Sequence, residues 1–204
     1  QYSVSVDGDE LREYVQWDAQ KPIYQNDGVV GLFGGLHYAD VIPALSATSE
    51  EEGFTLLFSG YKGEAEPEGS ETVYTSFGES LSIDADDVSM TLSNLSMDVS
   101  YHGSIVEALK GDLFESKVKA LIESMEITGI EPGTKVQLDN IALITDTNVH
   151  EDENTADVYV EYGIDKVVGP EIEATDMVLG VAINNLDIDF IKAYQEFSLS
   201  LIHI

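Results

Sequence analysis

The stretch MTLSNLSMDVSY (Met90–Tyr101) joins two runs of alternating apolar and polar residues that are out of phase. Apolar residues fall on even positions before Ser93-Asn94 and on odd positions after it. Successive side chains of a strand point to opposite faces, so one extra residue would normally turn the second run to the wrong face. A β-bulge absorbs the extra residue and bends the strand. The stretch therefore predicts a kinked strand with one apolar face.

The phrase LSNL within this stretch recurs as LDNI at Leu138–Ile141 and INNL at Ile183–Leu186, each time with the same change of phase. Weaker copies pass through Glu123-Ser124 and Ser59-Gly60. Asn and Gly readily adopt the left-handed conformation that a kink uses. We therefore expect kinks near Asn94, Asn140 and Asn185, at one level of neighbouring strands if they curve a sheet together. A tight turn between two short strands is the main alternative, and a ligand-binding set of three asparagines is a third.

The rest of the chain also favours strands. Several segments are β-branched, aromatic or alternating, and polar breaks separate them. The sequence predicts a mainly β fold with minor α content, a long curved antiparallel sheet or meander with β-bulges, in one domain over residues 1–204. The segments that carry this prediction are Ser3–Val6, Phe54–Phe58, Thr72–Phe77, Ser80–Ile83, Val88–Leu92 and Ala156–Ile164.

Three segments predict short helices. Asp9–Trp17 begins with acidic residues, and Ser104–Phe114 is interrupted by Gly111. Asp187–Phe197 places apolar residues at helical separations after an aspartate that could cap the helix.

The charge of the chain is extreme, with 39 acidic against 9 basic residues and a formal net charge of −30. The basic residues are scattered, so they form no stripe that could neutralise phosphates. Nucleic acid and anionic lipid head groups are therefore poor partners, and we expect no nucleic acid to bind. The charge indicates a solvated surface suited to a salty or cation-rich setting, and recruitment of divalent cations is the alternative.

No catalytic constellation stands out. The chain has no cysteine, and His37, His102, His150 and His203 lack the spacing of a zinc site. Ser100–Ser104 (SYHGS) sets hydroxyls beside an imidazole, but without the motif of a serine hydrolase. No phosphate loop or dinucleotide fingerprint is present. We therefore predict no catalytic residue, no cofactor and no assigned metal ligand.

Calcium is the most defensible ligand among the ions. Hard oxygen donors, which Ca²⁺ requires, gather in two predicted loops, although neither has the EF-hand pattern. The two acidic loops are Asp84–Asp87, with Asp84, Asp86 and Asp87, and Asp146–Glu153, with Asp146, Asn148, Glu151, Asp152 and Glu153.

Four runs resemble, in pattern and order, the middle of the YdgA-like family of bacterial envelope proteins, a domain of unknown function. They are VSMTLSNLSMDVSYHGS (Val88–Ser104), SMEITG (Ser124–Gly129), VQLDNIAL (Val136–Leu143) and DMVLGVAINNLDIDFIKAYQEF (Asp176–Phe197). The resemblance extends from about Gly53 to Phe197. It implies a periplasmic location behind an inner-membrane anchor, and a chain that is a fragment of a longer protein. It implies no reaction.

These observations lead to the hypothesis of a non-catalytic envelope scaffold or binding module. An apolar ligand on the concave face, self-association and other envelope proteins are its possible partners, and any membrane contact would come through an anchor outside this chain. A hydrolase of envelope polymers and a calcium-binding surface module are the alternatives.

Overall fold

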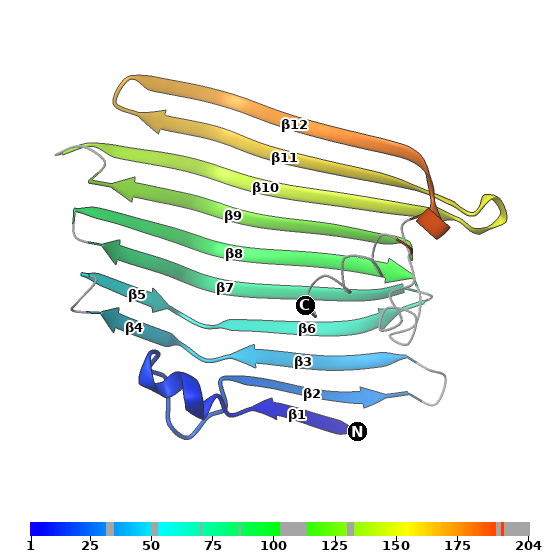
Figure 1. The fold of residues 1–204 in the computed structure, drawn as a ribbon, viewed down its shortest axis with the longest axis horizontal. Coiled ribbons are helices and arrows are strands. Elements are labelled where there is room, and N and C mark those ends of the chain that lie inside the picture. Colours follow the sequence, from blue (N-terminus) through cyan, green and yellow to red (C-terminus); the bar gives the residue numbers. More distant parts are fainter. Residues whose placement is uncertain are drawn as a thin grey trace.

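The computed structural model describes residues 1–31, 35–49, 53–69, 71–85, 87–102, 114–129, 133–190 and 193. Twelve strands form one open antiparallel sheet (Figure 1). They are β1 (Tyr2–Val6), β2 (Tyr24–Val30), β3 (Leu36–Ile42), β4 (Leu45–Ser49), β5 (Phe54–Phe58), β6 (Tyr61–Glu68), β7 (Glu71–Ala85), β8 (Val88–His102), β9 (Ser116–Thr128), β10 (Lys135–His150), β11 (Thr155–Gly169) and β12 (Ile172–Asp187).

The strands follow one another across the sheet in sequence order, as a meander. The long strand β7 pairs with β6 along one half and with β5 along the other, so β5 and β6 together occupy one strand position. Strands β3 and β4 share the next position, because β3 pairs with β6 and β4 pairs with β5. The predicted mainly β class and antiparallel meander are confirmed.

Helical structure is sparse among the described residues. The helix expected at Asp9–Trp17 is a shorter 3-10 helix, Asp9–Glu13, and a second 3-10 turn covers Glu151–Glu153. A helix begins at residue 188, and the backbone N–H of Phe190 donates to Asp187 Oδ1 at 3.1 Å, which confirms the predicted aspartate cap. The helix expected at Ser104–Phe114 lies outside the described residues except for Phe114. No described helical segment has the length and apolar character needed to cross a bilayer.

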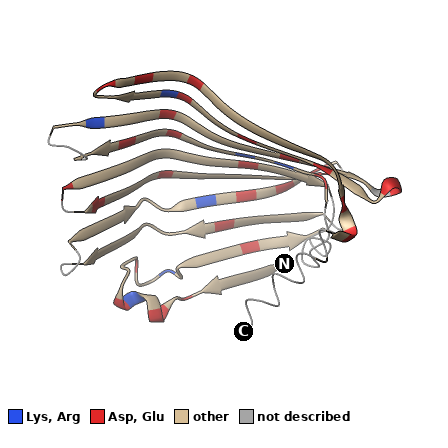
Figure 2. Cartoon of the chain, turned by 45° about the horizontal axis from the view of Figure 1, so that its top comes forward, with Lys and Arg blue, Asp and Glu red and all other residues tan. Residues whose placement is uncertain are grey.

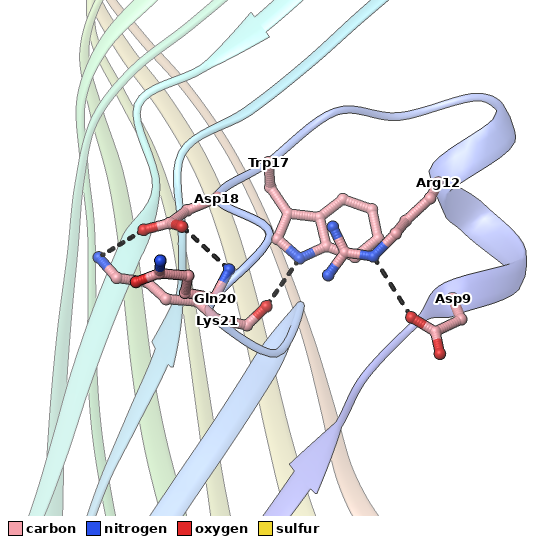
Figure 3. A network of polar contacts seen from close by, with 6 residues as sticks. All are labelled: Asp9, Arg12, Trp17, Asp18, Gln20 and Lys21. Atoms are coloured by element: carbon pink, nitrogen blue, oxygen red, sulfur yellow. Dashed lines mark hydrogen bonds and ion pairs between the residues drawn. The ribbon is translucent and has the colours of Figure 1, made fainter.

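The connection between β1 and β2 folds against the side of the sheet, where Gln16 forms an isolated bridge with Ser46. Figure 3 shows its contacts. The Arg12 guanidinium lies 3.9 Å from the centre of the Trp17 ring and pairs with Asp9 at 3.3 Å, and Trp17 Nε1 donates to the carbonyl of Lys21. A cation over an aromatic face is attracted by the ring, which fixes this connection. Trp17 then forms one wall of an open groove of about 500 Å³, together with residues of β4 and β5.

A line of kinks crosses the sheet. On β8 and β9, Ser93 pairs with Ser124 and Leu95 with Ile122, so Asn94 and Glu123 lie opposite each other while the ladder skips them. The same one-residue skip recurs in every pair of neighbouring strands from β7 to β12. Beside β7 the ladder has a wider gap, over residues 59–61, between the end of β5 and the start of β6. We call the residues along this line the kink row: Gly60, Glu79, Asn94, Glu123, Asn140, Asp165 and Asp176.

The kink row alternates between two kinds of residue. Strands that run in one direction supply a residue with positive φ: Gly60 (100°), Asn94 (53°), Asn140 (51°) and Asp176 (54°). The strands between them supply the acidic residues Glu79, Glu123 and Asp165. Where an asparagine meets an acid, its side-chain amide donates across the strands, from Asn94 to Glu123 and, at 2.9 Å, from Asn140 to Asp165. Because both strands carry an extra residue, the register on either side is unchanged.

The kinks predicted at Asn94 and Asn140 are confirmed, and β8 and β10 run through them as continuous strands rather than turning. The prediction that Asn185 lies at the same level as Asn94 and Asn140 is wrong. Asp176 takes the β12 position in the kink row. Asn185 (φ 56°) lies in a separate bulge, where the register shifts between the pairs Ala156–Leu186 and Val158–Ile183. There its N–H donates to Asp157 Oδ1 at 2.8 Å. Asparagine and aspartate both tolerate the left-handed region, so the phrase alone does not identify the row.

Register and alternation give the sheet an apolar face and a polar face. On the apolar face, Leu95, Ile122, Ile141, Ile164 and Met177 lie side by side on five strands just beyond the kink row. The corresponding set on the other side is Leu92, Met125, Leu138, Val167 and Ala174. The face continues across the row, because the Phe58 ring reaches to 3.7 Å from the position of a Cβ on Gly78. The two apolar runs on either side of the phase change therefore share one face, as the sequence predicts.

The sheet is a single layer in the part of the chain that the structure describes, and it bends (Figure 2). Among those residues the buried hydrophobic ones are few: Leu36, Ala65, Tyr74, Leu92, Ala156 and Ile188. Most side chains of the apolar face are half-buried.

Candidate functional site

Charged side chains of the strands are segregated by face. Apart from the kink row, alternation places the described Asp, Glu, Lys and His residues of the strands on the polar face, with one exception. That exception is Asp40 on β3, which lies in phase with the apolar-face residues Leu36, Tyr38 and Ile42. An acid in this phase is out of place, because burying a carboxylate is costly unless something satisfies it.

Asp40 is 8% exposed. The Tyr74 hydroxyl donates to its carboxylate, with distances of 3.2 and 3.4 Å to the two oxygens. The neighbouring strand makes room for this contact at Gly63, where a Cβ would lie 2.2 Å from both Asp40 Oδ1 and the Tyr74 hydroxyl. A glycine is therefore required between the two groups, which meet over its backbone.

Burial raises the pKa of Asp40, and a hydrogen bond from its own backbone N–H offsets this in part. None of the described Lys, Arg or His residues forms an ion pair with it. Asp40 is thus a buried carboxylate satisfied by neutral donors and not by a cation.

Tyrosines surround this carboxylate. The rings of Tyr38 and Tyr74 stack with centroids 5.9 Å apart and planes 26° apart. Burial, followed by the charges of Tyr101 and Asp40, raises the pKa of Tyr38 to about 12. Burial also raises the pKa of Tyr61, which hydrogen-bonds to Ser76. We call Tyr38, Tyr61 and Tyr74 the tyrosine cluster. It presents ring faces and hydroxyls around the single acid that the described strands place on this face outside the kink row.

Replacement of Asp40 by asparagine tests this environment through stability. Because the folded pKa of Asp40 is raised, the folded wild type binds the proton more tightly than the unfolded chain, whose aspartates titrate near about 3.9. Wild-type stability therefore gains as pH falls through the folded pKa. The advantage of Asp40→Asn over the wild type should be largest near neutral pH and should shrink toward about pH 4. Urea unfolding at several pH values measures it.

The control for this experiment is Asp98→Asn, which removes the same charge from an exposed position on the polar face. Because Asp98 is exposed, Asp98→Asn should not reproduce the pH dependence expected from removal of a buried carboxylate. A flat Asp40→Asn difference would contradict the burial of that carboxylate.

A second feature of the apolar face is an exposed patch at the β11–β12 edge of the sheet. Register places six apolar side chains side by side there, and β12 has no further strand beyond it in the described sheet. Tyr162, Leu179, Val181 and Ile183 are 56, 65, 53 and 47% exposed. We call the six the edge patch: Val158, Val160, Tyr162, Leu179, Val181 and Ile183.

The three described histidines all lie beside carboxylates on the polar face. His37 lies 4.0 Å from Glu64 and 3.8 Å from Glu66, and His150 lies 3.2 Å from Asp157. Among the described residues, His37, Glu64 and Glu66 form the group whose potential ligand atoms lie within 4.8 Å of one another. All three are exposed, so the group has no buried shell to orient it for a metal ion. His203 lies outside the described residues.

The SYHGS segment ends β8, and His102 lies between two glutamates. Its Nε2 is 3.3 Å from Glu71 and its Nδ1 is 3.5 Å from Glu115, so carboxylates rather than serine hydroxyls face both ring nitrogens. Ser104 lies outside the described residues.

The two acidic loops are placed only in part. Asp84 lies near the end of β7, and Asp87 lies in the turn that follows. Asp86 is outside the described residues. Asp146 lies on β10, where Lys117 pairs with it at 3.2 Å and Asn148 donates to it. Calcium binding by either loop stays a prediction.

Asp152 and Glu153 are exposed in the 3-10 turn that also contains Glu151. Nearby, the Asn185 N–H and then His150 lower the pKa of Asp157. This corner of the polar face is therefore organised by hydrogen bonds within the sheet.

Sequence reasoning missed Asp40 and its tyrosines, although a signal was present. In LHYADVI (Leu36–Ile42) the acid occupies the apolar phase of an alternating run, which is the mark of a buried carboxylate on a half-buried sheet.

Comparison with known protein families gives a match over nearly the whole chain. The model of a family described as bacterial proteins of unknown function (DUF945) matches residues 2–203. This range is wider than Gly53–Phe197, where the sequence resemblance was seen, and it agrees with the expectation of a bacterial family without assigned function. Neither the curated proteins nor the solved structures give a match.

Proposed function

We propose that this chain, which belongs to the bacterial family DUF945, is a non-catalytic binding module of the cell envelope whose apolar face holds an apolar ligand. The observation that carries the proposal is the single-layer sheet with one continuous apolar face, only half-buried in the described structure. Contiguous exposed apolar surface marks a binding site on most soluble proteins.

The edge patch supports a ligand that lies across the strands. Its exposed side chains continue the rows of Leu143, Thr145 and Thr147 on β10, with no charged residue between them in the described strands. Cross-strand rows of this kind give a long, flat surface of methyl and methylene groups, which suits an extended hydrocarbon better than a compact polar molecule.

Residues Val178 and Leu179 offer a matched test, because they are adjacent, equally exposed at 65% and on opposite faces. With a neutral fluorescent naphthylamine probe, Leu179→Asp should weaken binding by about tenfold, since burying one leucine is worth about 1.5 to 3 kcal/mol. Val178→Asp should leave binding within about twofold of the wild type. Equal effects of both substitutions, or no binding by the wild type, would reject the proposal.

Edge pairing is a second candidate, favoured by the length of β12. This strand has 16 residues, and register leaves one side of its backbone without a strand partner in the described sheet. Long exposed edges are templates for pairing with another chain. Native mass spectrometry of protein from its own host separates the two: a co-purifying apolar molecule supports ligand binding, and a dimer without one supports edge pairing.

Envelope location is part of the same proposal and is supported by the family resemblance noted from the sequence. Fractionation of cells that express the full-length gene product, with and without outer-membrane permeabilisation before protease, tests it. Protection from protease in permeabilised cells would place the domain elsewhere.

A further inference from the structure

We propose that Asp40 and the tyrosine cluster bind the ammonium head of an amphiphile whose hydrocarbon chain lies along the apolar face. The inference rests on the proposed function and adds the class of ligand to it. Its basis is one juxtaposition. A buried carboxylate without a cationic partner among the described residues lies on a face where, outside the kink row, the described strands place no other charged side chain.

The placement of Asp40 is hard to explain by stability alone. Tyr74 could have met a neutral acceptor, and a buried carboxylate that lacks a counter-charge costs free energy. The chain also keeps a glycine at position 63 so that the carboxylate and the Tyr74 hydroxyl fit together. A cation brought by a ligand would supply the missing charge, through hydrogen bonds that are stronger than those between neutral groups.

The surrounding groups suit an ammonium head in particular. The rings of Tyr38 and Tyr74 flank the acid, and aromatic faces attract cations. An ammonium carries several N–H donors, for which the carboxylate and the Tyr61 and Ser76 hydroxyls offer acceptors. The lysines of the described strands all lie on the polar face, so no side-chain cation there competes for Asp40.

Charge complementarity excludes the opposite class of amphiphile. With a net charge of −30, the protein repels an anionic head over the range of a Debye length, and Asp40 would repel it again at contact. The hydrocarbon chain would leave the tyrosine cluster along the rows of β8 to β11, since Tyr74 pairs with Val99 and Val99 with Val118.

The test compares decylamine, decanol and decanoate, which share a chain length, at physiological ionic strength by calorimetry. The wild type should prefer decylammonium over decanol by about tenfold, the size expected of one charge-assisted contact, and should bind decanoate most weakly. Asp40→Asn should bring the first two within about twofold. Asp98→Asn, which removes an equal charge from the polar face, should keep the preference.

The outcomes separate the two proposals. If the wild type binds all three compounds alike and Asp40→Asn changes nothing, the head-group inference fails while apolar binding stands. If it binds none, the proposed function fails. Equal loss of preference in both variants would indicate attraction by net charge only and would also overturn the inference.

A measurement on the wild type avoids dependence on the folding of a variant. A carbodiimide activates a carboxylate, a bound amine attacks it, and an amide forms as the urea leaves. Peptide mapping after coupling with decylamine should find the amide at Asp40 despite its burial. Modification of exposed carboxylates only, with Asp40 unmodified, would contradict the placement of the head group.

Discussion

Replacing Gly129 by alanine should destabilise the protein by about 3 kcal/mol or more, the range of severe backbone conflicts. Gly129 has a φ of 88°, and a Cβ there would lie 1.5 Å from the carbonyl oxygen of Asp87. That oxygen belongs to the backbone of the β7–β8 turn, so it cannot move aside as the end of a side chain would. The turn that follows β9 and the turn that precedes β8 must separate for the methyl group to fit. Urea unfolding measures the loss.

Gly133 provides the matched control in the same connection. Its φ is 79°, yet a Cβ there would meet nothing within 4 Å. Gly133→Ala should therefore carry only the left-handed strain, about 1 to 2 kcal/mol. Equal losses for the two variants would show that strain, and not contact with Asp87, decides the cost at Gly129.

Replacing Asn140 by valine should cost about 2 to 3 kcal/mol. The residue has a φ of 51°, which a β-branched side chain tolerates poorly, and its amide donates to Asp165 at 2.9 Å. Asn140→Gly keeps the backbone conformation and loses only the exposed hydrogen bond, so it should cost less than about 1 kcal/mol. Comparison of the midpoints and slopes of urea unfolding checks both values.

The position of Asn140 makes the result informative about the whole row. If valine and glycine are equally tolerated there, the kink row does not depend on left-handed residues. If Asn185→Val costs as much as Asn140→Val, the separate bulge of β12 stabilises the fold as strongly as a member of the row.

Most of the fold could be predicted from the sequence, because hydrophobic alternation and its changes of phase are local signals. Asn94 and Asn140 were identified as kinks on that basis alone. The position of Asp176 could not be found in this way, since TDMV (Thr175–Val178) lacks the asparagine phrase and its role depends on register with Asp165. Register between distant strands is a property of the assembled sheet and is not written in one segment.

The candidate site was less accessible to sequence reasoning. Asp40 and Tyr74 are 34 positions apart and meet only because β6 lies between their strands and contributes Gly63. Because the chain has 39 acidic residues, composition alone does not distinguish Asp40 from the others. Its position in the apolar phase of β3 was the available signal. The histidines of the polar face are the opposite case. Acidic residues are so abundant in this chain that carboxylate neighbours are expected for any exposed histidine.

The kink row also determines how the sheet can deform. The strand ladder is interrupted at one point on each of seven neighbouring strand positions, and these points lie along one line. Bending about that line breaks no strand pair, whereas bending elsewhere strains an intact ladder. We therefore expect the sheet to bend as two panels joined along a crease. A molecule lying across the crease would meet a surface that can change its opening angle while both panels keep their shape.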